Sequence, residues 1–257
     1  MKAGYHPGFK GDESPLRGSV FGRTEEMQQL RERLLSRRSF LLHGPPGVGK
    51  TLLLSALLPE LSKVLYSPEN STPQMLYRNL GEALIAGQDQ SPRRMGLASL
   101  QSKSAIATKG LVRGALRDSG HLIVVDHLVR PSQALAAAIR ELRVSCSAPI
   151  VAVSRSDHME DAGFVLQSFP DRKERLALRN FDPEAATQFA TWCASRERLQ
   201  ADNLAQFLER IVAHSAGNPG AMLHMIRLAR SSKYLHDGQI KVTPLYIDYK
   251  LATVADA

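Results

Sequence analysis

The stretch SFLLHGPPGVGKT, residues 39–51, decides the fold of this chain. It joins a short apolar run to the pattern G-x-x-x-x-G-K-[ST], which is matched in full from Gly44 to Thr51. Glycines permit backbone conformations in which successive amide groups point at one phosphate, and the helix that follows adds the positive end of its dipole. We therefore expect a buried strand, a phosphate-binding turn and a helix in this order.

The residues of this loop have separate expected roles. Lys50 would place a positive charge between the β- and γ-phosphates, and the Thr51 hydroxyl would complete the coordination shell of a Mg²⁺ ion. The expected nucleotide contacts are Gly44, Pro45, Pro46, Gly47, Val48, Gly49, Lys50, Thr51 and Leu52.

A carboxylate follows a second apolar run, in which Leu122 to Val125 lead directly into Asp126. A carboxylate at the end of a buried strand is costly without a nearby cation. Asp126 is therefore the expected second metal-shell group. The alternative, a carboxylate that caps the following loop, stays open.

Short apolar runs alternate with amphipathic helical patterns through the first two thirds of the chain. The expected strands are 39–43, 63–67, 121–126, 149–154 and 175–179. One helix is expected to begin at Thr24, and others are expected over 72–84, 103–118 and 132–143. A loop is expected over 87–102. Strands that are apolar throughout indicate a parallel sheet covered on both faces. The pattern predicts a three-layer α/β/α core with a parallel five-stranded sheet.

The strand pattern stops at Asp182, and three helical patterns follow it. This change indicates an α/β nucleotide-binding domain over residues 20–181 and a small all-helical lid over 182–237. Residues 1–19, rich in Gly, Pro and charge, are expected as a flexible arm, and 238–257 as a tail too short for another domain.

The composition is that of an ordinary globular protein, with 43% apolar and 23% charged residues. No apolar stretch is long enough for a membrane span or a secretory signal, so a cytoplasmic location without membrane contact is expected. Cys146 and Cys193 lack metal-ligand spacing and are expected as reduced packing residues. The net charge of +8 would favour polyanions, but the basic residues are spread along the chain.

With these motifs in order, residues 20–232 resemble the AAA+ and STAND branch of the P-loop NTPases, especially its initiator-like, bacterial helper and signalling ATPases. The resemblance implies a P-loop NTPase fold that binds ATP or ADP with Mg²⁺. The segment VFGRTEEM, 20–27, is similar to the one whose Gly-Arg pair lies against the adenine in this group. It implies Phe21, Gly22 and Arg23 as base-side contacts.

Two later motifs extend the resemblance. VAVSRS, 151–156, resembles the sensor-1 strand, which implies that Ser154 or Arg155 touches the γ-phosphate; an ordinary strand-to-loop exit is the alternative. SAGNPGAM, 215–222, resembles the G-x-P motif that opens a lid helix over the nucleotide, which implies a contact from Pro219. A proline in a first helical turn would explain the same residue without any function.

The segment PDRKERLALRNF, 170–181, occupies the place where oligomeric members of this group carry an arginine finger. Arg172 and Arg175 are therefore candidates for reaching the γ-phosphate of a neighbouring subunit. A solvated charged loop is the alternative for either residue.

His127 departs from the AAA+ pattern, in which the residue after Asp126 is the glutamate that activates water. A histidine can accept a proton at neutral pH, but its geometry differs and its charged form is disfavoured beside Mg²⁺. The sequence therefore predicts nucleotide binding with slow hydrolysis, coupled to opening and closing of the helical lid.

The partner of such a nucleotide-dependent switch is open. The resemblance to signalling ATPases implies self-association or a protein partner. The alternative is a DNA-associated helper ATPase, because Lys109, Arg113 and Arg117 would form a basic stripe on one helix, with Arg93 and Arg94 in the loop before it. A kinase acting on a small molecule is weaker, since it would explain neither the lid nor the sensor-like strand. The absence of N-K-x-D favours ATP over GTP.

Overall fold

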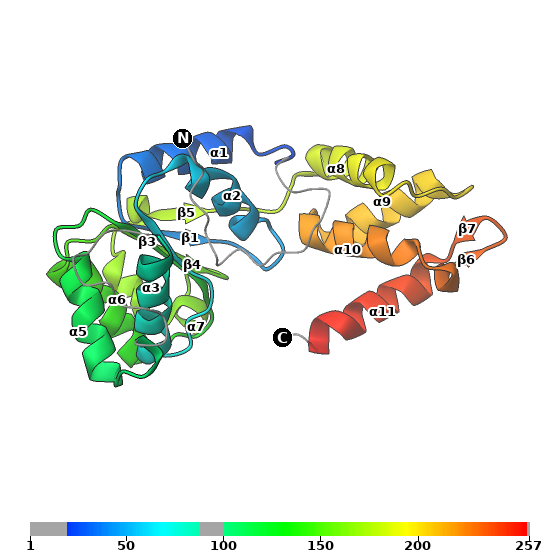
Figure 1. Cartoon of the computed structure of the whole chain (residues 1–257). Coiled ribbons are helices and arrows are strands. Elements are labelled where there is room, and N and C mark those ends of the chain that lie inside the picture. Colours follow the sequence, from blue (N-terminus) through cyan, green and yellow to red (C-terminus); the bar gives the residue numbers. More distant parts are fainter. Residues whose placement is uncertain (1–19, 88–99, 256–257) are drawn as a thin grey trace. The chain divides into compact units, whose positions relative to one another are not determined.

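The computed structural model describes residues 20–87 and 100–255, which form two compact units. The first unit contains residues 23–44, 50–87 and 100–178, and the second contains 20–22, 45–49 and 179–255. The glycine-rich loop therefore packs with the C-terminal helices, although the strand before it and the helix after it belong to the first unit. Figure 1 follows the chain through its elements.

The first unit is built on one parallel sheet with the strand order β2–β3–β4–β1–β5. Its strands are β1 (Phe40–His43), β2 (Val64–Ser67), β3 (Leu122–Leu128), β4 (Ile150–Ser154) and β5 (Arg175–Ala177). Because all five run in the same direction, the carboxyl ends of β1, β4 and β3 lie next to one another at one edge of the sheet. Asp126, near the end of β3, and Ser154, the last residue of β4, lie toward this edge.

Helices cover both faces of this sheet, as Figure 1 shows, with α1 and α2 on one side and the other helices of the unit on the opposite side. The helices are α1 (Thr24–Leu35), α2 (Lys50–Leu57), α3 (Pro73–Ala86), α5 (Ala105–Leu116), α6 (Gln133–Ser145) and α7 (Met159–Ala162), with 3₁₀ turns η1 (Leu58–Glu60), η2 (Gly163–Ser168) and η3 (Arg172–Glu174). The predicted three-layer α/β/α core with five parallel strands is confirmed.

The strand side chains alternate between the two faces. On the α3–α5–α6 side, Ile123 and Val125 of β3 pack with residues such as Leu80 and Ile139 in one buried cluster. Side-chain caps set the helix starts: Thr72, Ser104 and Ser132 accept hydrogen bonds from the first turns of α3, α5 and α6.

The second unit is mostly helical. It contains α8 (Pro183–Arg196), α9 (Leu204–Ser215), α10 (Pro219–Ala229), the turn η4 (Ser232–Tyr234), a two-stranded hairpin of β6 (Leu235–His236) and β7 (Gln239–Ile240), and α11 (Val242–Ala255). Asp182 caps α8, accepting from the Ala185 amide, and a proline follows it in the first turn.

Residues 238–257, expected as a tail, contain β7 and the whole of α11. Val242 and Leu245 belong to the same buried cluster as Phe207 and Met222 of the helical unit. The predicted arm over 1–19 and most of the predicted loop over 87–102 lie outside the described residues. Among the helices that are described, none combines the length and apolar character that a membrane crossing requires.

Candidate nucleotide-binding site

Asp126 and Thr51 meet although they are 75 residues apart in sequence. The Thr51 hydroxyl donates to Oδ2 of Asp126 at 3.0 Å, and Asp126 is only 1% exposed. In the described part of the chain, no group of three or more His, Cys, Asp or Glu side chains could hold a metal ion. An oxygen pair of this kind suits Mg²⁺, which takes one or two protein ligands and completes its shell with water and phosphate oxygens. The two predicted metal-shell residues therefore fit the ion.

The Asp126 carboxylate has two further donors. Tyr66 in β2 donates its hydroxyl to Oδ2 at 2.6 Å, and the backbone amide of His127 donates to Oδ1 at 2.7 Å. Burial raises the pKa of the Tyr66 hydroxyl, and the negative charge of Asp126 raises it further. Tyr66 therefore stays protonated and serves as a donor.

Lys50 lies beside this pair at the first turn of α2. Its ammonium group donates to the Gly44 carbonyl at 2.6 Å. Burial lowers the pKa of Lys50 to about 8; the charge of Asp126 acts in the opposite direction, and that of Arg155 adds to the lowering. A cation that is partly desolvated in this way gains free energy when an anionic phosphate comes within reach.

The glycine loop has the backbone that the sequence predicts. Gly47 and Gly49 have φ angles of +78° and +104°, which residues with a Cβ rarely adopt. The predicted contacts at the loop include both buried and exposed positions: Gly44 and Val48 are buried, Gly49 is half-buried, and Pro45, Pro46, Gly47 and Leu52 are exposed.

Within the second unit, the start of α10 holds two carbonyls of this loop. The Asn218 side-chain amide donates to the Pro46 carbonyl at 2.8 Å, and the Gly220 amide donates to the Gly47 carbonyl at 2.9 Å. Because the carbonyl and amide of one peptide point in opposite directions, these bonds turn the amides of Gly47 and Val48 away from α10. The first residues of α10 therefore set the orientation of the loop.

Close approach at this point requires a glycine. A Cβ on Gly220 would lie 2.8 Å from both Cα and O of Gly47. Pro219, the predicted nucleotide contact, is buried in the first turn between Asn218 and Gly220. A direct contact of Pro219 with a nucleotide stays a prediction.

Two of the three predicted base-side residues, Phe21 and Arg23, have partners within the protein. Phe21 packs against Phe189 and Trp192 in the second unit, with ring centroids 5.6 and 5.4 Å away. Gly22 has a φ of +62°. Arg23 is buried and donates to Glu26 at 2.7 Å. Contact of these residues with a base stays a prediction.

The two sensor candidates differ in their surroundings. Ser154 is buried and donates its hydroxyl to the Ser156 carbonyl within its own loop. Arg155 is half-buried, and its charge is felt at Lys50. Contact of either residue with a γ-phosphate stays a prediction.

The two candidate arginine fingers also differ. Arg175 in β5 donates to the Phe169 carbonyl at 3.1 Å and pairs with Asp157 at 3.4 Å. Arg172 is exposed on η3. Any role of Arg175 toward another subunit would require these contacts to break, whereas Arg172 is accessible as it stands.

His127 follows Asp126 with a φ of +53°, and its side chain is 58% exposed. Its Nδ1 lies 3.0 Å from the Pro68 carbonyl. A carbonyl can only accept, so Nδ1 carries the proton and the lone pair of the neutral ring is on Nε2. The ring is thereby tied to the loop after β2.

Sequence reasoning missed Tyr66, Asn218 and Gly220. A tyrosine in an otherwise apolar buried strand needs a partner for its hydroxyl, and this was an available signal. His43, at the end of β1, was also missed; its Nδ1 lies 3.8 Å from Asp157 Oδ1, and burial lowers its pKa.

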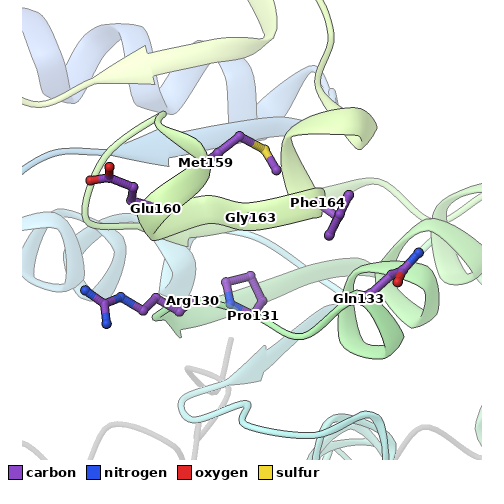
Figure 2. Close-up of a pocket in the computed structure, with 7 residues that line it drawn as sticks. All are labelled: Arg130, Pro131, Gln133, Met159, Glu160, Gly163 and Phe164. Atoms are coloured by element: carbon purple, nitrogen blue, oxygen red, sulfur yellow. The ribbon is translucent and has the colours of Figure 1, made fainter.

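A separate cavity of about 400 Å³ opens where the chain leaves β3 and β4. Figure 2 shows its lining, with residues from the two segments facing one another. The lining residues are Arg130, Pro131, Gln133, Met159, Glu160, Gly163 and Phe164. None of them is a predicted nucleotide contact.

Comparison with known proteins defines the class. Residues 19–223 match the family model of the AAA ATPase domain. The chain therefore belongs to this family of nucleotide-binding P-loop ATPases, as its motifs predict.

Solved structures share the fold at low sequence identity. A Walker-type ATPase of Pyrococcus abyssi matches with a TM-score of 0.63 and 16% identity, over 95% of this chain and 77% of its own. The ORC1 protein of Aeropyrum pernix, solved with DNA, matches with a TM-score of 0.65 and 15% identity, over 92% of this chain and 66% of its own. A STAND protein with a tetratricopeptide repeat sensor from Pyrococcus horikoshii matches with a TM-score of 0.52 and 14% identity, over 93% of this chain and 34% of its own. No curated protein matches the chain in sequence.

Proposed function

We propose that the chain binds Mg-ATP and acts as a nucleotide-dependent switch that hydrolyses ATP slowly. The observation that carries this proposal is the hydrogen bond between Thr51 and Asp126, with the Lys50 ammonium beside it. A hydroxyl, a carboxylate and a cation at the end of a glycine loop are the groups that bind a metal–polyphosphate complex. When bound, the metal would neutralise charge on the phosphates.

Different residues would bind the phosphates, the metal ion and the base. Lys50 and the loop amides would bind the phosphates, and Thr51 and Asp126 would hold the metal. Arg155 would add positive charge near the γ-phosphate. Phe21, Gly22 and Arg23 would lie toward the base.

Slow hydrolysis follows from the residue after Asp126. The His127 side chain is largely exposed and bonded to the Pro68 carbonyl, so a water-activating role would rest on Nε2 alone. A glutamate presents two equivalent oxygens and is already ionised at neutral pH, whereas a neutral imidazole has one acceptor and becomes a cation once it takes a proton. That cation would form close to a metal ion.

The test compares binding and turnover in one preparation. Calorimetry with Mg-ATP should give measurable affinity for the wild type and at least a tenfold weaker one for Lys50→Ala. Steady-state turnover should stay below about 1 s⁻¹, which is well under the typical enzymatic rate. Turnover above that rate, lost in His127→Ala, would show that histidine is an effective substitute for glutamate.

The alternative, a DNA-associated helper, rests on the basic character of the chain. Lys109 and Arg113 both pair with Glu141, at 2.7 and 2.9 Å, so this carboxylate offsets one of the three positive charges of the predicted stripe. Arg117 is the third charge of that stripe, and Arg93 and Arg94 lie outside the described residues. We therefore rank self-association or a protein partner ahead of DNA, with Arg172 as the accessible candidate for a contact between subunits.

A further inference from the structure

The carboxylate of Asp126 is almost fully committed to donors within the chain. Oδ2 accepts the hydroxyls of Thr51 and Tyr66, and Oδ1 accepts the His127 amide. A carboxylate offers about four acceptor sites, so one site on Oδ1 remains. The donors therefore decide which part of the carboxylate can face a metal ion or a water bound to it.

These donors are not equivalent. The Thr51 oxygen is itself a proposed metal ligand, and the His127 amide belongs to the backbone next to the carboxylate. Tyr66 is the side-chain donor that takes no part in the proposed metal shell. Its hydroxyl lies 2.6 Å from Oδ2, and the residue is 6% exposed in the core of the sheet.

The strand that carries Tyr66 is tied to the same place. Tyr66 is in register with Val124, two residues before Asp126. At the end of β2, the Asn70 side chain donates to the Asp126 carbonyl at 3.3 Å and to the Ser67 carbonyl at 3.1 Å. The backbone of β2, which carries the Tyr66 phenol, is therefore itself hydrogen-bonded to the strand that contains Asp126.

Packing alone would not require a tyrosine here, because phenylalanine fills the same space. The hydroxyl adds a donor to a buried anion, and partners of this kind orient the ligands of a metal ion. We propose that Tyr66 is a positioning residue that holds Asp126 for the divalent cation of the bound nucleotide complex. The inference rests on the proposed function, because it assigns a role at the same site.

The test uses the full-length chain and separates metal-dependent from metal-independent binding. Calorimetry measures the affinity for ATP once with Mg²⁺ and once with EDTA, and the ratio of the two is the Mg²⁺ enhancement. In Tyr66→Phe we expect the affinity in EDTA to match the wild type and the enhancement to fall about tenfold, the lower end of the usual effect of losing an outer-shell partner.

Tyr77→Phe is the matched control. Tyr77 is also a buried tyrosine, 3% exposed, whose hydroxyl donates to a carboxylate, that of Glu141 at 3.3 Å. Its side chain contacts Glu141 and Lys109, neither of which is a predicted phosphate or metal residue. Its variant should keep both affinities.

The outcomes are distinct. An unchanged Mg²⁺ enhancement in Tyr66→Phe overturns the inference while the proposed function stands. An equal loss in EDTA and in Mg²⁺, or a variant that circular dichroism shows to be unfolded, overturns it as well, because either assigns Tyr66 a structural role. A wild type that binds no ATP in either buffer removes the proposed function, and this inference with it.

Discussion

The substitution Gly220→Ala tests how much the contact between α10 and the glycine loop contributes to ATP affinity. The new Cβ would lie 2.8 Å from Cα and O of Gly47, and both of these are backbone atoms that cannot rotate away. Either the loop or the start of α10 must shift, and the 2.9 Å bond from the Gly220 amide to the Gly47 carbonyl would then lengthen or break.

The magnitude follows from three terms. Loss of one hydrogen bond costs about 1 kcal/mol, and overpacking costs about 1–3 kcal/mol. Alanine is a better helix former than glycine by up to about 1 kcal/mol, which offsets part of this cost. If ATP binding needs the present loop conformation, the binding free energy would weaken by about 2 kcal/mol, which corresponds to a roughly 30-fold larger Kd.

The assay is calorimetry with Mg-ATP, together with a thermal melt. Gly110→Ala is the matched control, because Gly110 also lies within a helix and its added Cβ would have no atom within 4 Å. That variant should gain up to about 1 kcal/mol of stability and bind ATP as the wild type does. A Gly220→Ala variant with wild-type affinity would refute the idea that α10 sets the loop.

Three further predictions concern protonation and charge. Since burial lowers the pKa of Lys50 to about 8, half of the ammonium is lost near pH 8. ATP affinity should therefore begin to fall as the pH approaches 8 and continue to fall above it, and a Lys50→Arg variant should show no such fall. Burial raises the pKa of the Cys193 thiol to about 12, so a thiol reagent at pH 8 should label it far more slowly in the native chain than in urea. Because Lys109 and Arg113 of the basic stripe are both engaged with Glu141, a gel shift with duplex DNA at about 150 mM salt should show no complex. A shift that weakens steeply with salt would restore the DNA alternative.

Local patterns were enough to predict the sheet and the loop. The five apolar runs are the five strands, and the glycines of the loop adopt the positive φ angles that their spacing implies. These features depend on residues that are neighbours in sequence, so they can be inferred without knowing the strand order.

Contacts between distant segments could not be predicted in this way. The Tyr66–Asp126 bond requires β2 and β3 to be adjacent, and the Asn218–Pro46 bond joins residues 172 positions apart. The sequence pattern did not predict helix α11, because the apolar residues of this helix do not form a clear stripe with a period of 3.6 residues. Its burial depends on partners in α10 rather than on its own pattern.

The helical unit is assembled from three separate pieces of chain, and this affects the order in which the protein can fold during synthesis. Phe21 leaves the ribosome long before Phe181, Phe189 and Trp192, the rings it packs against. Until those residues emerge, an aromatic side chain and the glycine loop lack their native partners. A nascent chain halted before residue 179 would therefore expose the Phe21 side chain, which a chaperone could recognise.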